Sequence, residues 1–215
     1  MPYFPLIQHY PTVILADGDF PTHPIALQIL QEAKTIVCCD GATENLLQNH
    51  LTPTAIVGDM DSLSAARRKQ FAAIIHQVTE QDTNDLTKAV NFCRQQNYGD
   101  ITILGATGKR EDHTLGNISL LAQYAAHTNV QLITNYGVFV ALHQSATLES
   151  RAGQQVSLFA LQSDAKITTR GLRYPLQNRT LTSWWQGSLN EAKGDSFSLL
   201  FENCGLLVYR NLDLS

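Results

Sequence analysis

Apolar and polar residues follow two different patterns along this chain. Before about residue 143, short apolar runs rich in β-branched residues occur at residues 12–16, 35–39, 54–58, 100–105 and 130–134. Nearly every residue in these runs is apolar, which is typical of strands covered by helices on both faces. The pattern therefore predicts a mostly parallel sheet in this part of the chain.

The segments between these runs have helical periodicity. One stripe consists of Leu86, Ala89, Val90 and Cys93, and another of Leu115, Ile118, Leu121 and Ala125. Spacings of three and four residues place such side chains on one face of a helix. Strands that alternate with such helices predict a doubly wound α/β fold with helices on both faces of the sheet.

After about residue 143 the pattern changes to short runs that alternate with a period of two. These runs lie at residues 155–161, 165–172, 195–201 and 205–210, separated by Gly, Asn and Asp. The alternation predicts a small antiparallel β-sandwich. We therefore expect an α/β domain over residues 1–143 and a β-sandwich domain over residues 144–215.

The composition is that of a globular protein. The chain has 215 residues, of which 44% are apolar, so it can bury a core in one large domain or two small ones. The net charge of −4 argues against a nucleic-acid-binding protein. The sequence shows neither an apolar run of the ~18 residues that a membrane span needs nor a signal peptide at its start. We therefore expect a cytoplasmic protein that binds no nucleic acid and no membrane.

The cysteines agree with this expectation. Cys38 and Cys39 are adjacent within an apolar run, whereas Cys93 and Cys204 stand alone. No pair has the C-x-x-C spacing of a zinc or redox site. We expect buried, reduced thiols.

Acidic residues follow several of the predicted strands. The segments are Asp17-Gly18-Asp19, Asp40-Gly41 and Asp59-Met60-Asp61-Ser62, and a further acidic segment, Glu80 to Asp85, precedes the first helical stripe. In an open α/β sheet, ligands bind beyond the carboxyl ends of the strands. These acids are therefore candidates for one site.

Asp59 and Asp61 predict a metal site. If the strand continues through them, their side chains lie on one face, roughly 6.5 Å apart, and repel each other by about 2–3 kcal/mol at an effective dielectric constant near 20. A divalent cation removes that repulsion, and oxygen ligands favour Mg²⁺ or Ca²⁺. A solvated turn is the alternative for one such pair. Asp40, Asp82 and Asp85 at the same sheet end favour the metal.

The segment before the Leu86 helix also has a structural interpretation. Asp82 or Asn84 can cap the N-terminus of that helix. Lys88 can be an ordinary helical partner of Asp85, three residues away. Capping explains one of these residues but not both acids together with Lys88.

The glycine-rich segment 105–112 resembles a phosphate loop without matching the P-loop motif. Gly108-Lys109 is followed by Arg110 rather than Ser or Thr, and Ile103 stands where the motif has its first glycine. Its small residues, the Arg110 guanidinium and the helix that follows can still hold a phosphate. Alternatively, Asp112 is a helix cap and His113 a first-turn residue.

In their order along the chain, these segments resemble the motifs of the thiamine pyrophosphokinase (thiamin diphosphokinase) family. The matching segments are Asp40-Gly41-Ala42 with Glu44-Asn45, Val57 to Ser62, Gln81 to Ala89, Gly105 to His113 with Asn117, Gly171 to Leu176, and Gly187 to Glu191. Asn84 stands where the family usually has Thr, and Tyr174 stands where it commonly has Trp.

The resemblance implies a transferase that moves the pyrophosphoryl group of ATP to the hydroxyl of thiamine and yields thiamine diphosphate and AMP. Such a transfer depends mainly on positioning and charge neutralisation. The implied catalytic residues are Asp59, Asp61, Asp82, Asp85, Lys88, Arg110 and Asp112, and the implied Mg²⁺ ligands are Asp40, Asp59, Asp61 and Asp82. Lys88 and Arg110 are expected to neutralise phosphate charge, and Asp85 or Asp112 to orient or deprotonate the hydroxyl.

The resemblance also implies where each substrate binds. ATP, the co-substrate, is expected at Gly41, Thr107, Gly108, Arg110 and His113, and thiamine at Tyr174, Ser188 and Asn190. Residues 1–143 are then the catalytic domain that binds ATP and Mg²⁺, and residues 144–215 bind thiamine and form a homodimer with the site at the subunit boundary. Alternatively, Tyr174 is a core residue and Ser188 and Asn190 are turn residues. Trp184 and Trp185 are expected to be packing residues that face opposite ways on a strand.

Parts of the sequence are compatible with two other functions. Residues 55–62 also resemble the nucleophile segment of haloacid-dehalogenase-type phosphatases, in which Asp59 would form a covalent aspartyl-phosphate. A non-catalytic nucleotide-binding module is the second alternative. Both leave the other motifs unexplained.

Overall fold

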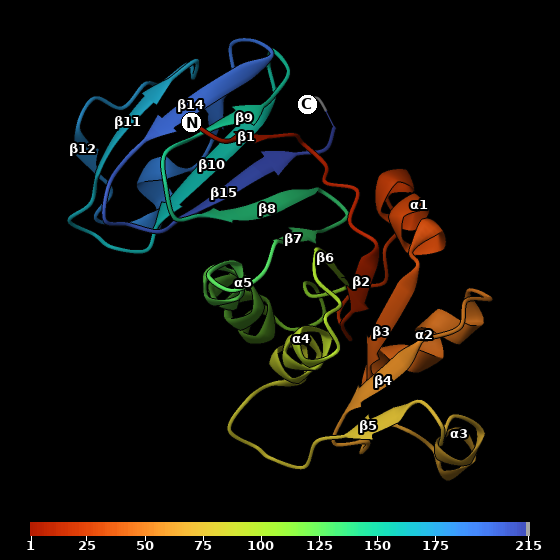
Figure 1. The fold of residues 1–215 in the computed structure, drawn as a ribbon. Coiled ribbons are helices and arrows are strands. Elements are labelled where there is room, and N and C mark those ends of the chain that lie inside the picture. The colour runs from red at the N-terminus through yellow and green to blue at the C-terminus, as the bar shows by residue number, and fades with distance from the viewer. Residues whose placement is uncertain (214–215) are drawn as a thin grey trace. The chain divides into compact units, whose positions relative to one another are not determined.

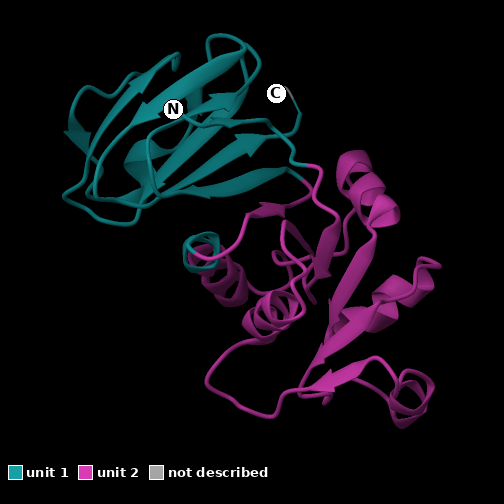
Figure 2. Ribbon diagram, in the orientation of Figure 1, with its two compact units in different colours: residues 1–8, 121–126, 136–215 teal, residues 9–120, 127–135 magenta. Residues whose placement is uncertain are grey.

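The computed structural model describes residues 1–213, which form two compact units (Figure 2). The first, here called the α/β unit, comprises residues 9–120 and 127–135. The second, the β unit, comprises residues 1–8, residues 121–126 and the chain from Tyr136 onward. The fold therefore combines a helix-covered parallel sheet with antiparallel strands, as the sequence predicted.

The α/β unit contains a parallel sheet with the strand order β7-β6-β2-β3-β4-β5. The strands are β2 (Thr12–Leu15), β3 (Thr35–Cys39), β4 (Ala55–Gly58), β5 (Ile75–Gln77), β6 (Ile101–Leu104) and β7 (Val130–Ile133). Every residue of β2, β4, β6 and β7 is buried, which explains their near-continuous apolar sequences. The edge strand β5 is polar and largely exposed, so its sequence gave no such signal.

Helices cover both faces of this sheet. Its helices are α1 (Pro24–Glu32), η1 (Asp40–Ala42), α2 (Thr43–Gln48), α3 (Ala65–Gln70), α4 (Asp85–Gln95) and α5 (Glu111–Ala125), whose last residues belong to the β unit. Helices α1 and α2 lie on one face and α4 and α5 on the other (Figure 1). This arrangement follows from right-handed crossovers, because the chain moves outward from β2 to β5 and then returns to β6.

The predicted helical stripes have different outcomes. The α4 stripe is confirmed, because Leu86, Ala89, Val90 and Cys93 are all buried. The α5 stripe is confirmed only in part: Leu121 is buried, Ile118 and Ala125 are half-buried, and Leu115 is 57% exposed. The buried residues of α5 are Leu121, Ala122 and Tyr124, near its C-terminus. The first turns of α5 instead border the cleft described below, where Gly116 and Asn117 line the wall.

The strand order reverses between β2 and β6, and the two loops that follow these strands are joined by hydrogen bonds. The Gly18 N–H donates to the carbonyl of Gly105 (2.6 Å), and the Asp19 N–H donates to the carbonyl of Thr107 (2.8 Å). Such a reversal creates a crevice at the carboxyl ends of the strands. This is the position of the candidate site.

The β unit contains two groups of strands. The strands β8 (Gly137–Leu142), β10 (Gln155–Ala160), β13 (Asn190–Glu191) and β15 (Leu206–Asn211) pair antiparallel in the order β13-β10-β15-β8. The second sheet has the order β1-β9-β14-β11-β12 and comprises β1 (Tyr3–Phe4), β9 (Ala146–Glu149), β11 (Lys166–Arg170), β12 (Arg179–Thr180) and β14 (Ser196–Leu200). Alternate residues of β10 and β14 are buried, which explains the period of two.

A buried arginine joins the N-terminal segment to the last strand of the β unit, β15. Arg210 is fully buried and donates hydrogen bonds to the carbonyls of Phe4, Pro5, Leu6 and Glu149. The Leu6 N–H in turn donates to the Glu149 carboxylate (2.7 Å). Burial lowers the pKa of Arg210 to about 10. The first residues of the chain are therefore fixed to its last strand.

Two further expectations can be compared with the structure. Trp184 and Trp185 do not lie on a strand: they begin the short 3₁₀ helix η2 (Trp184–Gly187), and their exposures are 43% and 75%. Cys38, Cys39, Cys93 and Cys204 are buried free thiols, as expected. Among residues 1–213, no helix is long and apolar enough to cross a membrane.

Candidate active site

A cleft of about 550 Å³ lies within the α/β unit, at the carboxyl ends of its strands. Its walls come from the loops after β2, β4 and β6 and from the N-terminal turns of α4 and α5. The charged residues that line it are Asp17, Asp59, Asp85, Lys88, Lys109, Arg110 and Asp112. The cleft therefore combines both signs of charge at the reversal of strand order.

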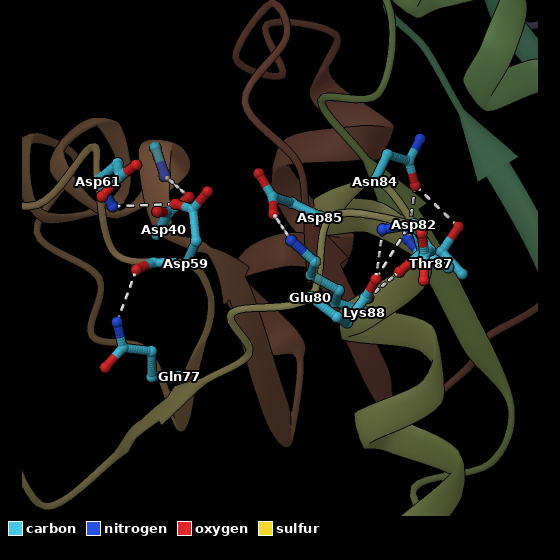
Figure 3. A network of polar contacts seen from close by, with 12 residues as sticks. Asp40, Asp59, Asp61, Gln77, Glu80, Asp82, Asn84, Asp85, Thr87 and Lys88 are labelled. Carbon is cyan, nitrogen blue, oxygen red and sulfur yellow. Dashed lines mark hydrogen bonds and ion pairs between the residues drawn. The ribbon is translucent and has the colours of Figure 1, made fainter.

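Asp40 provides a buried carboxylate directly after β3, next in sequence to Cys39, which lines the cleft; Asp40 itself does not line it. It is 3% exposed, and its Oδ1 accepts the Gly41 N–H (2.8 Å). Its Oδ2 finds no hydrogen-bond partner among residues 1–213. Burial raises the pKa of Asp40, and the negative charges of Asp85 and Asp59 raise it further. Asp85 and Asp59 therefore both act electrostatically on Asp40; all three side chains are drawn in Figure 3.

The loop after β4 corrects the expected geometry of Asp59 and Asp61. The strand ends at Gly58, and Met60 has a left-handed backbone (φ +74°), so the two carboxylates do not continue a strand side by side. Instead, the Asp61 N–H donates to Asp59 Oδ1 (3.0 Å), which lowers the pKa of Asp59. The side chain of Gln77 also donates to the Asp59 carbonyl (2.9 Å; Figure 3).

Met60 anchors this loop in the protein interior. Its side chain is 2% exposed and packs in a cluster with Ile56 and Leu63. The guanidinium of Arg68, on α3, donates to the carbonyls of Met60 and Leu63. Sequence reasoning missed Arg68, because nothing in its helix indicates that it reaches back to the loop.

The segment before α4 resolves the question of the helix cap. Asn84, and not Asp82, is the N-cap, because its Oδ1 accepts the Thr87 N–H (2.9 Å; Figure 3). Glu80 accepts hydrogen bonds from the Asp82 N–H and from the hydroxyl and N–H of Thr83. These bonds lower the pKa of Glu80, and the bond from the Thr83 hydroxyl contributes most. Asp82 itself is exposed. Neither Asp82 nor Asp61 lines the cleft.

Lys88 is the buried cation of the site. Its ammonium lies 3.2 Å from Asp85, its predicted helical partner, and its side chain is only 3% exposed. A buried lysine needs a counter-ion, and Asp85 provides one while its own side chain remains 41% exposed. The Lys88–Asp85 pair is therefore part of the cleft wall.

The glycine-rich turn after β6 carries two more cations. Gly108 has φ +83°, and its N–H donates to the Thr114 hydroxyl (3.1 Å) at the start of α5. Arg110 makes a bidentate contact with Asp112, with bonds of 3.0 Å and 2.5 Å. The hydrogen bond from Arg110 is the main reason why the pKa of Asp112 falls to about 2. Lys109 lies 2.8 Å from Asp17, a pair that the sequence did not indicate.

The other predicted nucleotide-binding residues lie around the same turn. Gly108 and His113 line the cleft. The carbonyl of Thr107 accepts the Asp19 N–H. Gly41 lies so near to Asp17 that an added Cβ would be 2.6 Å from Asp17 Oδ2. The α/β unit therefore brings most of the predicted phosphate site together.

The three predicted thiamine residues lie in the β unit. Tyr174 is 60% exposed and therefore not a core residue. Asn190, on β13, accepts the Tyr174 N–H (3.1 Å) and donates to the Tyr174 carbonyl (2.8 Å). The Ser188 hydroxyl donates to the Trp185 carbonyl (2.7 Å). Asn190 thus fixes the backbone that carries the exposed ring.

The donor set fits a divalent cation bound together with phosphate. No group of three or more His, Cys, Asp or Glu side chains in residues 1–213 is arranged to hold a metal alone. Mg²⁺, however, commonly takes one or two protein carboxylates and completes its shell with water and phosphate oxygens. The unpartnered Asp40 Oδ2, close to Asp59 and Asp85, is an oxygen available to such an ion.

Known proteins resemble this chain over most of its length. Residues 26–134 match the family model for the thiamin pyrophosphokinase catalytic domain, and residues 137–209 match the model for its substrate-binding domain. Thiamine pyrophosphokinase 1 of Oryza sativa subsp. japonica is 32% identical over 145 residues, which are 60% of this chain and 55% of that protein. Thiamine pyrophosphokinase of Bacillus subtilis is 28% identical over 178 residues, which are 79% of this chain and 83% of that one.

Solved structures give the same result. The crystal structure of the Bacillus subtilis thiamine pyrophosphokinase has a TM-score of 0.77 at 27% identity and covers 94% of this chain and 99% of its own. Thiamin pyrophosphokinase from Candida albicans has a TM-score of 0.79 at 18% identity, a likeness of fold that covers 99% of this chain and 93% of that one.

Proposed function

Because this chain belongs to the thiamin pyrophosphokinase family, whose catalytic and substrate-binding domains both match it, we propose that it is an ATP:thiamine diphosphotransferase. It would transfer the pyrophosphoryl group of ATP to the hydroxyl of thiamine and release AMP. The comparisons give no support to a haloacid-dehalogenase-type phosphatase or to a non-catalytic nucleotide-binding module.

The observation that carries this proposal is the mixture of charges in and beside the cleft. The negative charges of Asp85 and Asp59 both act on the buried Asp40 and add to the effect of its burial in raising its pKa. Lys88 and Arg110 face the same cleft. An ATP–Mg²⁺ complex carries both signs of charge. Its cation can neutralise the carboxylates, and its phosphate oxygens can accept hydrogen bonds from the lysine and arginine side chains.

We propose that Mg²⁺ binds at Asp40 and Asp59, where it would neutralise phosphate charge. Asp85 lies beside them, and its ion pair with Lys88 orients both groups. Asp61 contributes through its backbone, which holds the Asp59 carboxylate. Direct metal ligation by Asp61 or Asp82 stays a prediction.

The chain's own groups can align the reaction. In the transfer, the thiamine hydroxyl oxygen bonds to the β-phosphorus, the bond from that phosphorus to the oxygen bridging it to the α-phosphorus breaks, and the hydroxyl proton leaves. Lys88 and the planar donors of Arg110 would stabilise phosphate charge. We propose that Asp85, which lines the cleft beside Lys88, orients the hydroxyl and accepts its proton, whereas the Asp112 carboxylate is paired with Arg110.

We assign thiamine binding to the β unit, in residues that match the family's substrate-binding domain. The exposed ring of Tyr174 offers a face for the cationic thiazolium or the flat pyrimidine. Exposed apolar side chains near it in the sequence, Trp185 and Leu189, favour a surface that another molecule covers. We propose a homodimer in which this surface completes the site at the subunit boundary.

The cellular compartment is also a proposal. The four cysteines are buried free thiols, and ATP is the substrate. Both properties fit a reducing, ATP-containing compartment. We propose the cytoplasm.

An AMP assay tests the proposed function. The purified protein is incubated with ATP and Mg²⁺, with and without thiamine, and AMP and thiamine diphosphate are quantified. We expect equal amounts of both products, formed only with thiamine. Asp59→Asn should lower turnover at least about a hundredfold, whereas Asp164→Asn, an exposed acid of the β unit, should not. Release of inorganic phosphate without thiamine, or no AMP at all, would refute the proposal.

A further inference from the structure

Each cation of the cleft is paired with a carboxylate. Lys88 pairs with Asp85, Arg110 with Asp112, and Lys109 with Asp17. The first two pairs connect residues close in sequence. The third joins residues 92 positions apart, and neither of them has a role in the function proposed above.

The Lys109–Asp17 pair is not explained by fold stability. Both side chains are 48% exposed, and ion pairs that are this accessible to water contribute little to stability. Lys109 also has φ +57°, a left-handed backbone that favours glycine over lysine. A lysine at such a position, directly after Gly108, indicates a use for its ammonium.

The pair lies at the reversal of strand order. Asp17 follows β2 and Lys109 follows β6, the two strands between which the order reverses. The hydrogen bonds from Gly18 and Asp19 to the β6 loop fix the spacing of the two loops. Both side chains of the pair line the cleft beside Arg110. Lys109 therefore carries a mobile point charge at the place where the fold binds ligands.

We infer that Lys109 is a phosphate ligand of the bound nucleotide and that Asp17 is its counter-ion in the free enzyme. This inference rests on the proposed function. On binding, the Lys109 ammonium leaves the Asp17 carboxylate for a triphosphate oxygen, and no covalent bond changes. The exchange is favourable because the triphosphate carries several negative charges, whereas Asp17 carries one and is well hydrated.

Two opposite effects on ATP binding test this exchange. Lys109→Gln and Lys109→Gly should raise the KM for ATP about tenfold and leave the KM for thiamine unchanged. Lys109→Gly should fold at least as stably as the wild type, because glycine suits the left-handed position. Asp17→Asn should lower the KM for ATP severalfold, because it removes the competing carboxylate. Lys69→Gln, on the exposed face of α3, is the matched control and should change neither constant.

The outcomes separate this inference from the proposed function. If the wild type forms no AMP with thiamine, the proposed function fails. If the wild type is active but both Lys109 variants keep its KM for ATP, Lys109 is not a phosphate ligand. If Asp17→Asn leaves the KM for ATP unchanged, or raises it as Lys109→Gln does, Asp17 is not a competing counter-ion. Direct binding of a non-hydrolysable ATP analogue, measured by calorimetry, should follow the same order of affinities.

Discussion

The guanidinium of Arg68 donates a hydrogen bond to the carbonyl of Met60, eight residues earlier in the chain. Met60 separates the two acids of the loop after β4, and its left-handed backbone turns Asp61 so that its N–H meets the Asp59 carboxylate. Arg68 therefore holds the backbone on which a proposed metal ligand depends, although it does not reach the cleft itself.

This relationship predicts that Arg68 positions Asp59. Arg68→Ala should raise the Mg²⁺ concentration needed for half-maximal turnover about tenfold, and saturating Mg²⁺ should restore most of the activity. Arg68→Lys should have a smaller effect on the Mg²⁺ requirement than Arg68→Ala, because lysine provides a hydrogen-bond donor although it lacks the planar fork of arginine. The measurement is turnover against Mg²⁺ concentration at saturating ATP and thiamine.

The neighbouring residue supplies the control for Arg68. Arg67 pairs with Glu44 at the surface, and Arg67→Ala should leave the Mg²⁺ requirement unchanged. An equal shift in both variants would show that α3 as a whole, and not Arg68, supports the loop.

Asp40 should oppose stability when no cation is present. Its pKa is raised in the folded protein, mainly by burial, so its ionisation destabilises the fold. Asp40→Asn should raise the Tm of the Mg²⁺-free protein by about 2–4 °C at neutral pH, which corresponds to about 1 kcal/mol for a chain of this size. Turnover should nevertheless be nearly lost.

The pH dependence of this effect has a defined sign. A carboxyl group whose folded pKa is raised contributes its full stability below its unfolded pKa, and that contribution is lost as pH rises through the folded pKa. The difference in Tm between Asp40→Asn and the wild type should therefore vanish below about pH 4. A difference that persists there would assign the effect to packing instead of charge.

Arg110 should be needed for its shape as well as its charge. Arg110→Lys keeps the charge but loses the bidentate donor geometry, so kcat/KM for ATP should fall about tenfold or more. The Tm should not change, because Arg110 and Asp112 are exposed. Arg94→Lys, at the exposed end of α4, is the matched control. Normal kinetics of Arg110→Lys would show that a point charge suffices.

The sequence predicted the elements whose signal is local. The buried strands β2, β4, β6 and β7 and the α4 stripe were visible because each repeats a pattern within a few residues. The strand ends also located the acids of the site, since parallel strands end at the same sheet edge.

Features that depend on distant contacts were not predictable. From the sequence alone, the charged side chain of Arg210 is expected at the surface. In the structure it is buried and donates hydrogen bonds to the carbonyls of residues 4–6. The turn at Met60 was missed because methionine gives no signal of a left-handed backbone. The role that we propose for Asp17 depends on Lys109, 92 positions later, whose ammonium lies 2.8 Å from the Asp17 carboxylate.

The last prediction concerns the proposed shared site. The acids lie in the α/β unit and Tyr174 in the β unit. In the proposed homodimer, a site at the subunit boundary would take the acids from one chain and Tyr174 from the other. Tyr174→Ala should then raise the KM for thiamine more than the KM for ATP, because it removes contact with one substrate only. Asn190→Ala should act in the same direction, because it releases the Tyr174 backbone from two hydrogen bonds.

A mixing experiment distinguishes a shared site from a site within one chain. Asp59→Asn chains and Tyr174→Ala/Asn190→Ala chains are each expected to be nearly inactive. In a heterodimer of the two, one site draws its acids and its aromatic residue from unaltered parts of different chains, so activity should return toward half of the wild-type value per dimer. The measurement is AMP formation after subunit exchange, which tagged chains and native mass spectrometry can verify. If verified heterodimers stay inactive, each site lies within a single chain; if sedimentation shows an active monomer, the dimer is refuted as well.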